Sequence, residues 1–126
     1  MRILLDTHLI LWWVSNSPSL SEQGRQLISD PENTVFISAV SLWEIWLKES
    51  LGKLRLPPDF EEKLATESFE SLPLTSGQAR HVARLPWRHR DPFDRLLVAQ
   101  ALEEKLILLT ADDLVAAYGT CVQLVR

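Results

Sequence analysis

Four acidic residues are spaced along the chain so that a parallel sheet would gather them at one edge. Asp6 ends the first apolar run of the sequence, and Asp112 comes shortly after a later apolar run. Glu44 lies inside a nearly all-apolar helical stretch, and Asp94 lies in the first turn of a helix opened by Pro92. Converging carboxylates repel one another and lose hydration on burial, so the usual resolution is a bound divalent cation. The pattern predicts metal-assisted chemistry on a phosphate ester, with Mg²⁺ or Mn²⁺ favoured because all the ligands are oxygens.

Glu44 is the least ambiguous of these acids. At about 100° per residue it shares a helix side with Val40, Leu47 and Leu51, whereas Glu49 on the opposite side is an ordinary solvated glutamate. Solubility does not require a charge on the apolar side, so its presence favours a functional role. The alternative is an ion pair with a buried arginine.

Asp94 has a structural alternative as well. Asp91, Pro92 and Asp94 have the form of a helix start, with Asp91 as N-cap, proline at the first position and Asp94 at the third. Asp91 can be a cap and nothing more. Asp94, however, shares its helix side with Leu97 and Val98, so we expect it to face inward.

Asp6 and Asp112 follow apolar runs, and each has a capping alternative, with Thr110 and Asp113 as competing caps beside Asp112. In an open α/β sheet, however, ligands bind at the carboxyl ends of the strands. One metal site explains all the acids at these matching positions more economically than a separate structural role for each.

Short apolar runs alternate with helical stretches, which predicts an α/β fold with a parallel sheet. The expected strands are residues 2–5, 34–37, 106–109 and 122–125, with a short edge strand at 72–74. The expected helices are residues 9–14, 21–28, 39–50, 59–67, 76–85, 92–105 and 112–118. Ser38 is the expected N-cap of the third helix, and Thr75 or Ser76 that of the fifth.

The composition fits one globular domain spanning residues 1–126, with 46% hydrophobic and 24% charged residues. Cys121 is the only cysteine, which excludes an internal disulfide and a cysteine zinc cluster. No apolar run approaches the roughly 20 residues that span a membrane, and the first residues do not form a signal peptide. We therefore expect a cytoplasmic protein without a membrane partner.

The formal net charge of -4 argues against tight nonspecific DNA binding. The basic residues are nevertheless concentrated, because five of the nine arginines lie between residues 80 and 95. Arginine binds phosphate through two parallel hydrogen bonds, so this segment suits a polyanion held beside the acidic pocket. The expected RNA-binding residues are Arg84, Arg88, Arg90 and Arg95. The alternative for each arginine is a solvated helix face.

The aromatic residues and histidines give weaker signals. Five tryptophans are many for 126 residues, and tryptophan is enriched at interface anchors, so we expect Trp12 or Trp13 to be exposed. His8, His81 and His89 have no metal-ligand spacing with one another, and the spacing assigns none of them a catalytic role.

Four segments carry a resemblance that covers the whole chain: Leu4–Thr7, Ser41–Ile45, His89–Ala101 and Leu109–Asp112. In their order and spacing they resemble the PIN domain, and most closely its VapC-type branch, the ribonuclease toxins of bacterial toxin–antitoxin pairs. The resemblance implies a three-layer α/β/α domain with a central, mainly parallel sheet. It also implies an RNA endonuclease that uses Mg²⁺ or Mn²⁺ bound by Asp6, Glu44, Asp94 and Asp112.

The same resemblance implies supporting residues and partners. Thr110 matches a hydroxyl position that orients water or a ligand, and Asp91 and Asp113 are additional acids near the metal. Family members are commonly homodimers, inhibited by a small antitoxin whose tail fills a groove near the site. Contact with DNA is then expected only indirectly, through the antitoxin.

Three other interpretations remain open from the sequence. A receiver-like signalling domain also gathers acids around Mg²⁺, but it needs an acidic pair after the first strand, where this chain has Thr7 and His8. A PIN-shaped scaffold that only binds partners would leave the electrostatic cost of the clustered acids unexplained. A PIN nuclease that acts in RNA processing or on DNA ends shares the chemistry, but the small size and the lack of a further nucleic-acid module favour the toxin.

Overall fold

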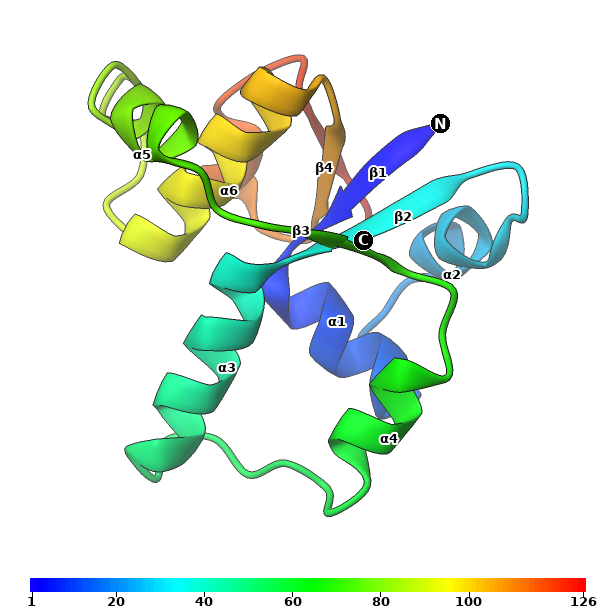
Figure 1. Ribbon diagram of the computed structural model, residues 1–126. Coiled ribbons are helices and arrows are strands. Elements are labelled where there is room, and N and C mark those ends of the chain that lie inside the picture. The colour runs from blue at the N-terminus through cyan, green and yellow to red at the C-terminus, as the bar shows by residue number, and fades with distance from the viewer.

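The computed structural model describes residues 1–126 and is built on one five-stranded sheet with the order β3-β2-β1-β4-β5 (Figure 1). The strands are β1 (Arg2–Leu5), β2 (Thr34–Ser38), β3 (Glu70–Leu72), β4 (Ile107–Thr110) and β5 (Val122–Leu124). All the strand pairs are parallel, which confirms the predicted α/β fold with a parallel sheet. The edge strand ends just before Pro73 rather than containing it, because proline has no N–H to donate.

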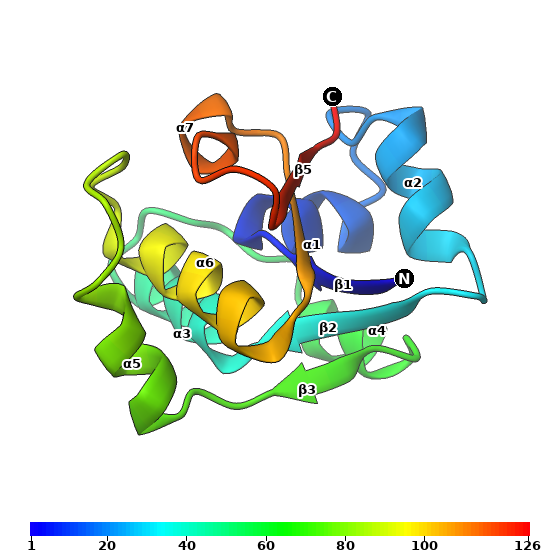
Figure 2. The same ribbon diagram turned by 90° about the horizontal axis from the view of Figure 1, so that it is seen from above.

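Helices cover both faces of the sheet. They are α1 (Thr7–Val14), α2 (Glu22–Ser29), α3 (Ala39–Ser50), α4 (Phe60–Ala65), α5 (Ser76–Val82), α6 (Pro92–Glu104) and α7 (Asp113–Ala116). Helices α1, α2 and α4 lie on one side, and α5 and α6 lie on the other (Figure 2). Helix α3 packs against both α1 and α6, so it joins the two layers.

The central strand shows why these layers form. Ile3 and Leu5 point into one hydrophobic cluster and Leu4 into the other, and none of the three is accessible to solvent. Successive side chains of a strand point to opposite faces, so a strand covered by helices on both sides is a continuous apolar run. This burial holds the carboxyl end of β1, and Asp6 after it, in a fixed place.

The helix starts follow the expected capping chemistry. The Ser38 hydroxyl accepts a hydrogen bond from the Val40 N–H at 3.0 Å, as predicted for the start of α3. Of the two candidates for α5, Thr75 is the cap, and it forms a reciprocal pair of hydrogen bonds with Gln78. Gly119 has φ +99°, a left-handed conformation suited to glycine, and lies in the turn between α7 and β5.

The strand order locates the ligand-binding edge. The chain moves outward from β1 to β2 and β3 and later returns to the other side of β1 with β4 and β5. The crevice between β1 and β4 is therefore the topological switch point, where open α/β sheets bind ligands. A receiver-like domain has the order 2-1-3-4-5, so the observed order excludes that interpretation. No helix is both long and apolar enough to cross a membrane.

Candidate metal centre

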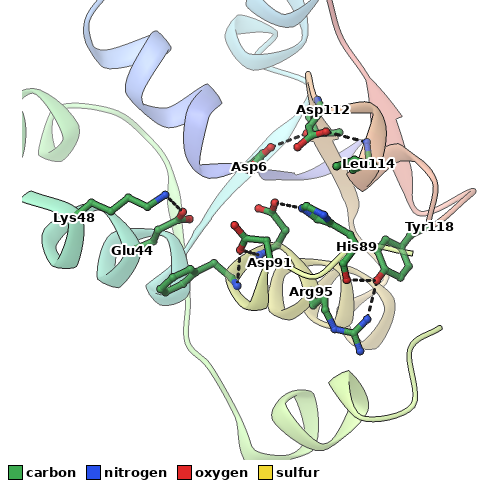
Figure 3. A network of polar contacts seen from close by, with 12 residues as sticks. Asp6, Glu44, Lys48, His89, Asp91, Arg95, Asp112, Leu114 and Tyr118 are labelled. Atoms are coloured by element: carbon green, nitrogen blue, oxygen red, sulfur yellow. Dashed lines mark hydrogen bonds and ion pairs between the residues drawn. The ribbon is translucent and has the colours of Figure 1, made fainter. Parts of the chain in front are cut away.

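The acidic residues come from several elements around the switch point. Asp6 directly follows β1, and Asp112 lies two residues after the end of β4. Glu44 lies in α3 and Asp94 in the first turn of α6. Figure 3 shows Asp6 and Asp112 close together, His89 approaching from the loop before α6, and Glu44 opposite on α3. The sheet topology thus brings distant segments to one place.

Asp6 is the most deeply held of these acids. Its side chain is buried, and Oδ2 accepts a hydrogen bond of 2.6 Å from the Thr110 hydroxyl. The second oxygen, Oδ1, is buried without a hydrogen-bond partner. Burial raises the pKa of Asp6 above its ordinary value, and the charge of Glu44 adds to the rise. An unpaired oxygen in this position is what a cation ligand requires.

Glu44 is also buried, although it lies on a helix. Its Oε2 accepts a hydrogen bond of 2.5 Å from Lys48, one turn further along α3, whereas Oε1 is buried without a partner. The alternative of a buried arginine partner is wrong, because the observed cation is a lysine at the solvent edge. The Glu44 hydrogen bond raises the pKa of Lys48, and the charges of Asp91 and Asp94 add to it.

Asp94 is held by His89. The ring Nε2 of His89 lies 2.7 Å from Oδ2 of Asp94, and both side chains are largely buried. Burial first, and the charge of Asp6 second, raise the pKa of Asp94 to about 7, while the contact with His89 works in the opposite direction. One ligand atom from each of His89, Asp94 and Asp112 lies within 4.8 Å of the others, so these side chains can hold one ion.

His89 is the residue that spacing did not identify. It lies five residues before Asp94 and outside the helix, so helical periodicity does not place the two on one face. The available signal was its position in the segment His89–Ala101, two residues before Asp91, the N-cap of α6.

The additional acids have different positions. Asp112 accepts a hydrogen bond from the Leu114 N–H at 2.8 Å with one oxygen, so it both caps α7 and faces the cluster. Asp91 caps α6 by accepting hydrogen bonds from the N–H groups of Phe93 and Asp94. Asp113 is exposed and forms an ion pair of 2.7 Å with Arg126. Asp91 is thus engaged as a helix cap and Asp113 in a surface ion pair.

An open cavity of about 460 Å³ gives access to this centre. It is lined by acids and by side chains of α1 and α7, among them Asp6, His8, Asp112 and Asp113. A second cavity of about 440 Å³ begins at Glu44 and runs between α1, α3 and the loop before α4. The acids can therefore be reached by a ligand from outside the protein.

Arg95 is a correction to the expected RNA-binding set. Arg84, Arg88 and Arg90 are exposed and form no ion pair, but Arg95 is only 2% exposed. Its guanidinium donates hydrogen bonds to Tyr118, to the Val82 carbonyl at the end of α5 and to the Pro86 carbonyl of the following loop. A buried guanidinium with these partners cannot reach a phosphate, so Arg95 has a structural role.

The expected exposure of Trp12 or Trp13 is also wrong. Both side chains are half-buried and pack against the core cluster beneath α1. The exposed tryptophans are Trp43, Trp46 and Trp87. Trp87 lies in the loop between α5 and α6, where helical periodicity gives no indication of exposure.

The donor set fits a divalent cation. Asp6 and Glu44 each present a buried oxygen without a partner, and hard carboxylate oxygens are the ligands that Mg²⁺ and Mn²⁺ prefer. The fold and site together define a class: α/β proteins with an acidic centre at the switch point of a parallel sheet.

Comparison with known proteins narrows this class. The family model described as "PIN domain" matches residues 3–119. The chain is 30% identical over 113 residues to "Ribonuclease VapC22" of Mycobacterium tuberculosis, covering 87% of this chain and 86% of that protein. The chain belongs to the PIN-domain family and is a homologue of a VapC-type ribonuclease, which confirms the resemblance seen in the sequence motifs.

Solved structures show the same fold. VapBC2 from Rickettsia felis, bound to a DNA fragment from its promoter, matches with a TM-score of 0.76 and 16% identity over 100% of both chains. FitAcB from Neisseria gonorrhoeae matches with a TM-score of 0.66 and 22% identity over 95% of both chains. At these identities the likeness supports the fold, and the function has to be argued from the site.

Proposed function

We propose that this protein is a metal-dependent endoribonuclease, the toxin of a bacterial toxin–antitoxin pair. The observation that carries the proposal is the pair of buried carboxylate oxygens without partners, on Asp6 and Glu44, in the acidic centre of a PIN fold. A protein that only bound partners would gain nothing from two uncompensated buried oxygens.

The proposed metal ligands are Asp6, Glu44, Asp94 and Asp112. When bound, a Mg²⁺ or Mn²⁺ ion would activate the attacking water and offset the charge that develops on the phosphate oxygens. Thr110 fixes the orientation of Asp6 through its hydroxyl, and His89 holds Asp94.

The remaining groups accept the proton of the attacking water and bind the RNA. A carboxylate that is not fully committed to the ion can accept the proton of the attacking water. The exposed side chains of Arg84, Arg88 and Arg90 lie on the loop that leads to Asp94, and they bind the phosphates that flank the cleaved bond.

The proposed protein partners are a second copy of the chain and a small antitoxin. Similar solved structures include a toxin–antitoxin complex from Klebsiella pneumoniae, with a TM-score of 0.65 and 18% identity over 96% of this chain. The cavity next to Glu44 is partly apolar, with Leu11, Trp12 and Phe60 in its lining, and suits an antitoxin tail. DNA contact would come through the antitoxin.

An RNA cleavage assay tests the proposed activity. End-labelled single-stranded and structured RNAs are incubated with the pure protein in Mg²⁺, in Mn²⁺ or in EDTA. We expect internal cuts that require metal. Glu44→Gln should reduce cleavage by about 100-fold or more, because it removes a ligand charge. Glu49→Gln changes an exposed residue of the same helix and should cleave normally. Equal cleavage by both variants would refute the site, and no cleavage by the parent protein would refute the activity.

A further inference from the structure

Arg95 fixes the loop between α5 and α6 by hydrogen bonds from its buried side chain. One nitrogen of the buried guanidinium donates to the Pro86 carbonyl at 3.1 Å and to the Tyr118 hydroxyl at 2.8 Å. The other donates to the Val82 carbonyl at 2.9 Å. The Tyr118 hydroxyl in turn lies 3.5 Å from the carbonyl oxygen of His89. These contacts fix both ends of the loop, so its side chains project from a defined backbone.

Trp87 lies at the outside of this loop. Its side chain is 78% exposed, and the guanidinium carbon of Arg95 lies 3.8 Å from the ring centroid. A single exposed aromatic residue would need no explanation by itself. Here, however, one face of the ring rests on a cation that is fixed by its own hydrogen bonds. The other face is left available to solvent in a set orientation.

The surroundings of Trp87 are positively charged. Residues 80–90 contain four arginines and two histidines and no aspartate or glutamate. Arg84, Arg88 and Arg90 are exposed and form no ion pair. His89, two residues after Trp87, contacts Asp94 of the acidic centre, and backbone atoms two residues apart lie within about 7 Å. The exposed ring therefore lies in a basic segment, two residues from a side chain that contacts the acidic centre.

We propose that Trp87 is a stacking platform for one unpaired base of the RNA substrate, next to the cleaved phosphate. The inference rests on the proposed ribonuclease function and adds a substrate subsite to it. Aromatic side chains that stack on bases beside a basic groove are a general means of binding single strands. A base inside a duplex cannot present its face to the ring, so Trp87 would direct cleavage to unpaired segments.

The test combines a protein change with an RNA change. Binding of fluorescein-labelled eight-nucleotide RNAs is measured by anisotropy in EDTA and in a Glu44→Gln background, so that cleavage is suppressed during the measurement. In one series a single abasic site is moved along the RNA, leaving the phosphates unchanged. Trp87→Ala should weaken binding of intact RNA by about 10-fold, since loss of one stacked base has an effect of that order. Trp87→Phe, which keeps a ring, should retain most of the affinity.

The abasic series identifies the stacked base. At one position the missing base should weaken binding to the protein with Trp87 by about 10-fold and leave binding to the Trp87→Ala variant unchanged. Trp46→Ala, which removes another exposed tryptophan from α3, should give the same abasic profile as the parent. Thermal unfolding of each variant is measured in parallel, because the ring also covers Arg95.

Each outcome has a defined meaning. If Trp87→Ala weakens intact and abasic RNAs equally, the ring has only a structural role and the proposal is overturned. If RNA affinity is unchanged but self-association measured by sedimentation is lost, Trp87 belongs to a protein contact and the proposal is also overturned. Metal-dependent cleavage by the parent with no effect of Trp87→Ala refutes the stacking alone. A parent that neither binds nor cleaves RNA refutes the ribonuclease function itself.

Discussion

At the scale of single residues, one hydroxyl organises two acids. The Thr110 hydroxyl donates to Asp6 at 2.6 Å and accepts a hydrogen bond from the Asp112 N–H at 3.0 Å. Thr110 is fully buried, so water cannot replace either contact. The hydroxyl holds one oxygen of Asp6 and leaves the other free. Hydrogen bonds of this kind, made to a metal ligand by a residue that does not bind the ion, fix the orientation of that ligand.

Replacement of this hydroxyl gives a first prediction. Thr110→Val keeps the shape of the side chain but removes the donor, so metal-dependent RNA cleavage should fall by about 10- to 100-fold. Thr110→Ser keeps the hydroxyl and should retain most of the activity. Thr120→Val, at an exposed position after α7, is the matched control. Equal activity of the valine and serine variants would show that the contact with Asp6 does not matter.

His89 gives a second prediction at the same scale. Its ring nitrogen lies 2.7 Å from Asp94 and within the group of potential ligand atoms. His89→Ala should therefore weaken Mn²⁺ binding, measured by calorimetry without RNA, by about 10-fold or more. His81 forms a similar pair with Glu103, but on the exposed surface of α5, so His81→Ala is the control. Unchanged Mn²⁺ binding in His89→Ala would remove His89 from the metal centre.

At the scale of elements, a buried chain of polar side chains ties together the parts that carry Glu44 and Asp94. The Ser38 hydroxyl, at the junction of β2 and α3, donates to Gln100 of α6 at 2.5 Å. Gln100 in turn donates to Gln78 of α5 at 3.1 Å. All three side chains are almost inaccessible to solvent. Their hydrogen bonds fix the relative positions of α3 and α6, and with them the separation of the two acids.

The third prediction concerns the loss of this series of buried hydrogen bonds. Gln100→Leu fills a similar volume but removes the acceptor of the Ser38 hydroxyl and the donor to the Pro73 carbonyl, so the free energy of unfolding should fall by about 1–3 kcal/mol for each group left unsatisfied. Urea unfolding measures the change. Gln23→Leu, on the exposed surface of α2, should be close to neutral. A Gln100→Leu protein as stable as the parent would show that the polar chain contributes specificity rather than stability.

Local patterns predicted the elements well for a physical reason. Strands β1, β2 and β4 are buried on both faces and therefore appear in the sequence as apolar runs. The caps of α3 and α6 depend on contacts within three residues, which the sequence shows directly. Pairings across the fold are different. Thr110 and Asp6 lie 104 residues apart, and no periodicity in either segment indicates their hydrogen bond.

The same distinction explains the errors within the site. Arg95 lies in a basic segment and is a residue type that commonly binds phosphate. In the fold, however, its guanidinium donates a hydrogen bond to Tyr118, 23 positions away. His89 was not recognised because it lies in the loop before the predicted helix, where periodicity does not place it beside Asp94. Asp94 and Asp112 have ligand atoms within 4.8 Å of each other and of His89, and Asp6 and Glu44 are not part of that group. The sequence predicted a single site for these four acids. It did not indicate which neighbours would orient them.

At the scale of the whole molecule, the topology concentrates negative charge at one edge of the sheet. Burial raises the pKa values of Asp6 and Asp94, and repulsion from neighbouring carboxylates adds to the rise in both. Lys48 supplies a compensating charge to Glu44, at 2.5 Å. The fold thus holds several carboxylates close together, which is unfavourable without a cation. The repulsion arises only when the separate helices and strands are assembled.

This charge balance predicts how the stability of the metal-free protein depends on pH. The pKa of Asp94 is about 7 in the folded state and 3.8 in its unperturbed form. Between these values the unfolded chain has released the proton that the folded protein keeps, so stability falls as pH rises and levels off above about 7. Urea unfolding in EDTA should therefore show lower stability at pH 8 than at pH 5. Mn²⁺ should restore stability at pH 8 and have little effect at pH 5. Asp94→Asn should flatten the dependence, whereas a metal-free protein that gains stability from pH 5 to pH 8 would contradict the charge balance.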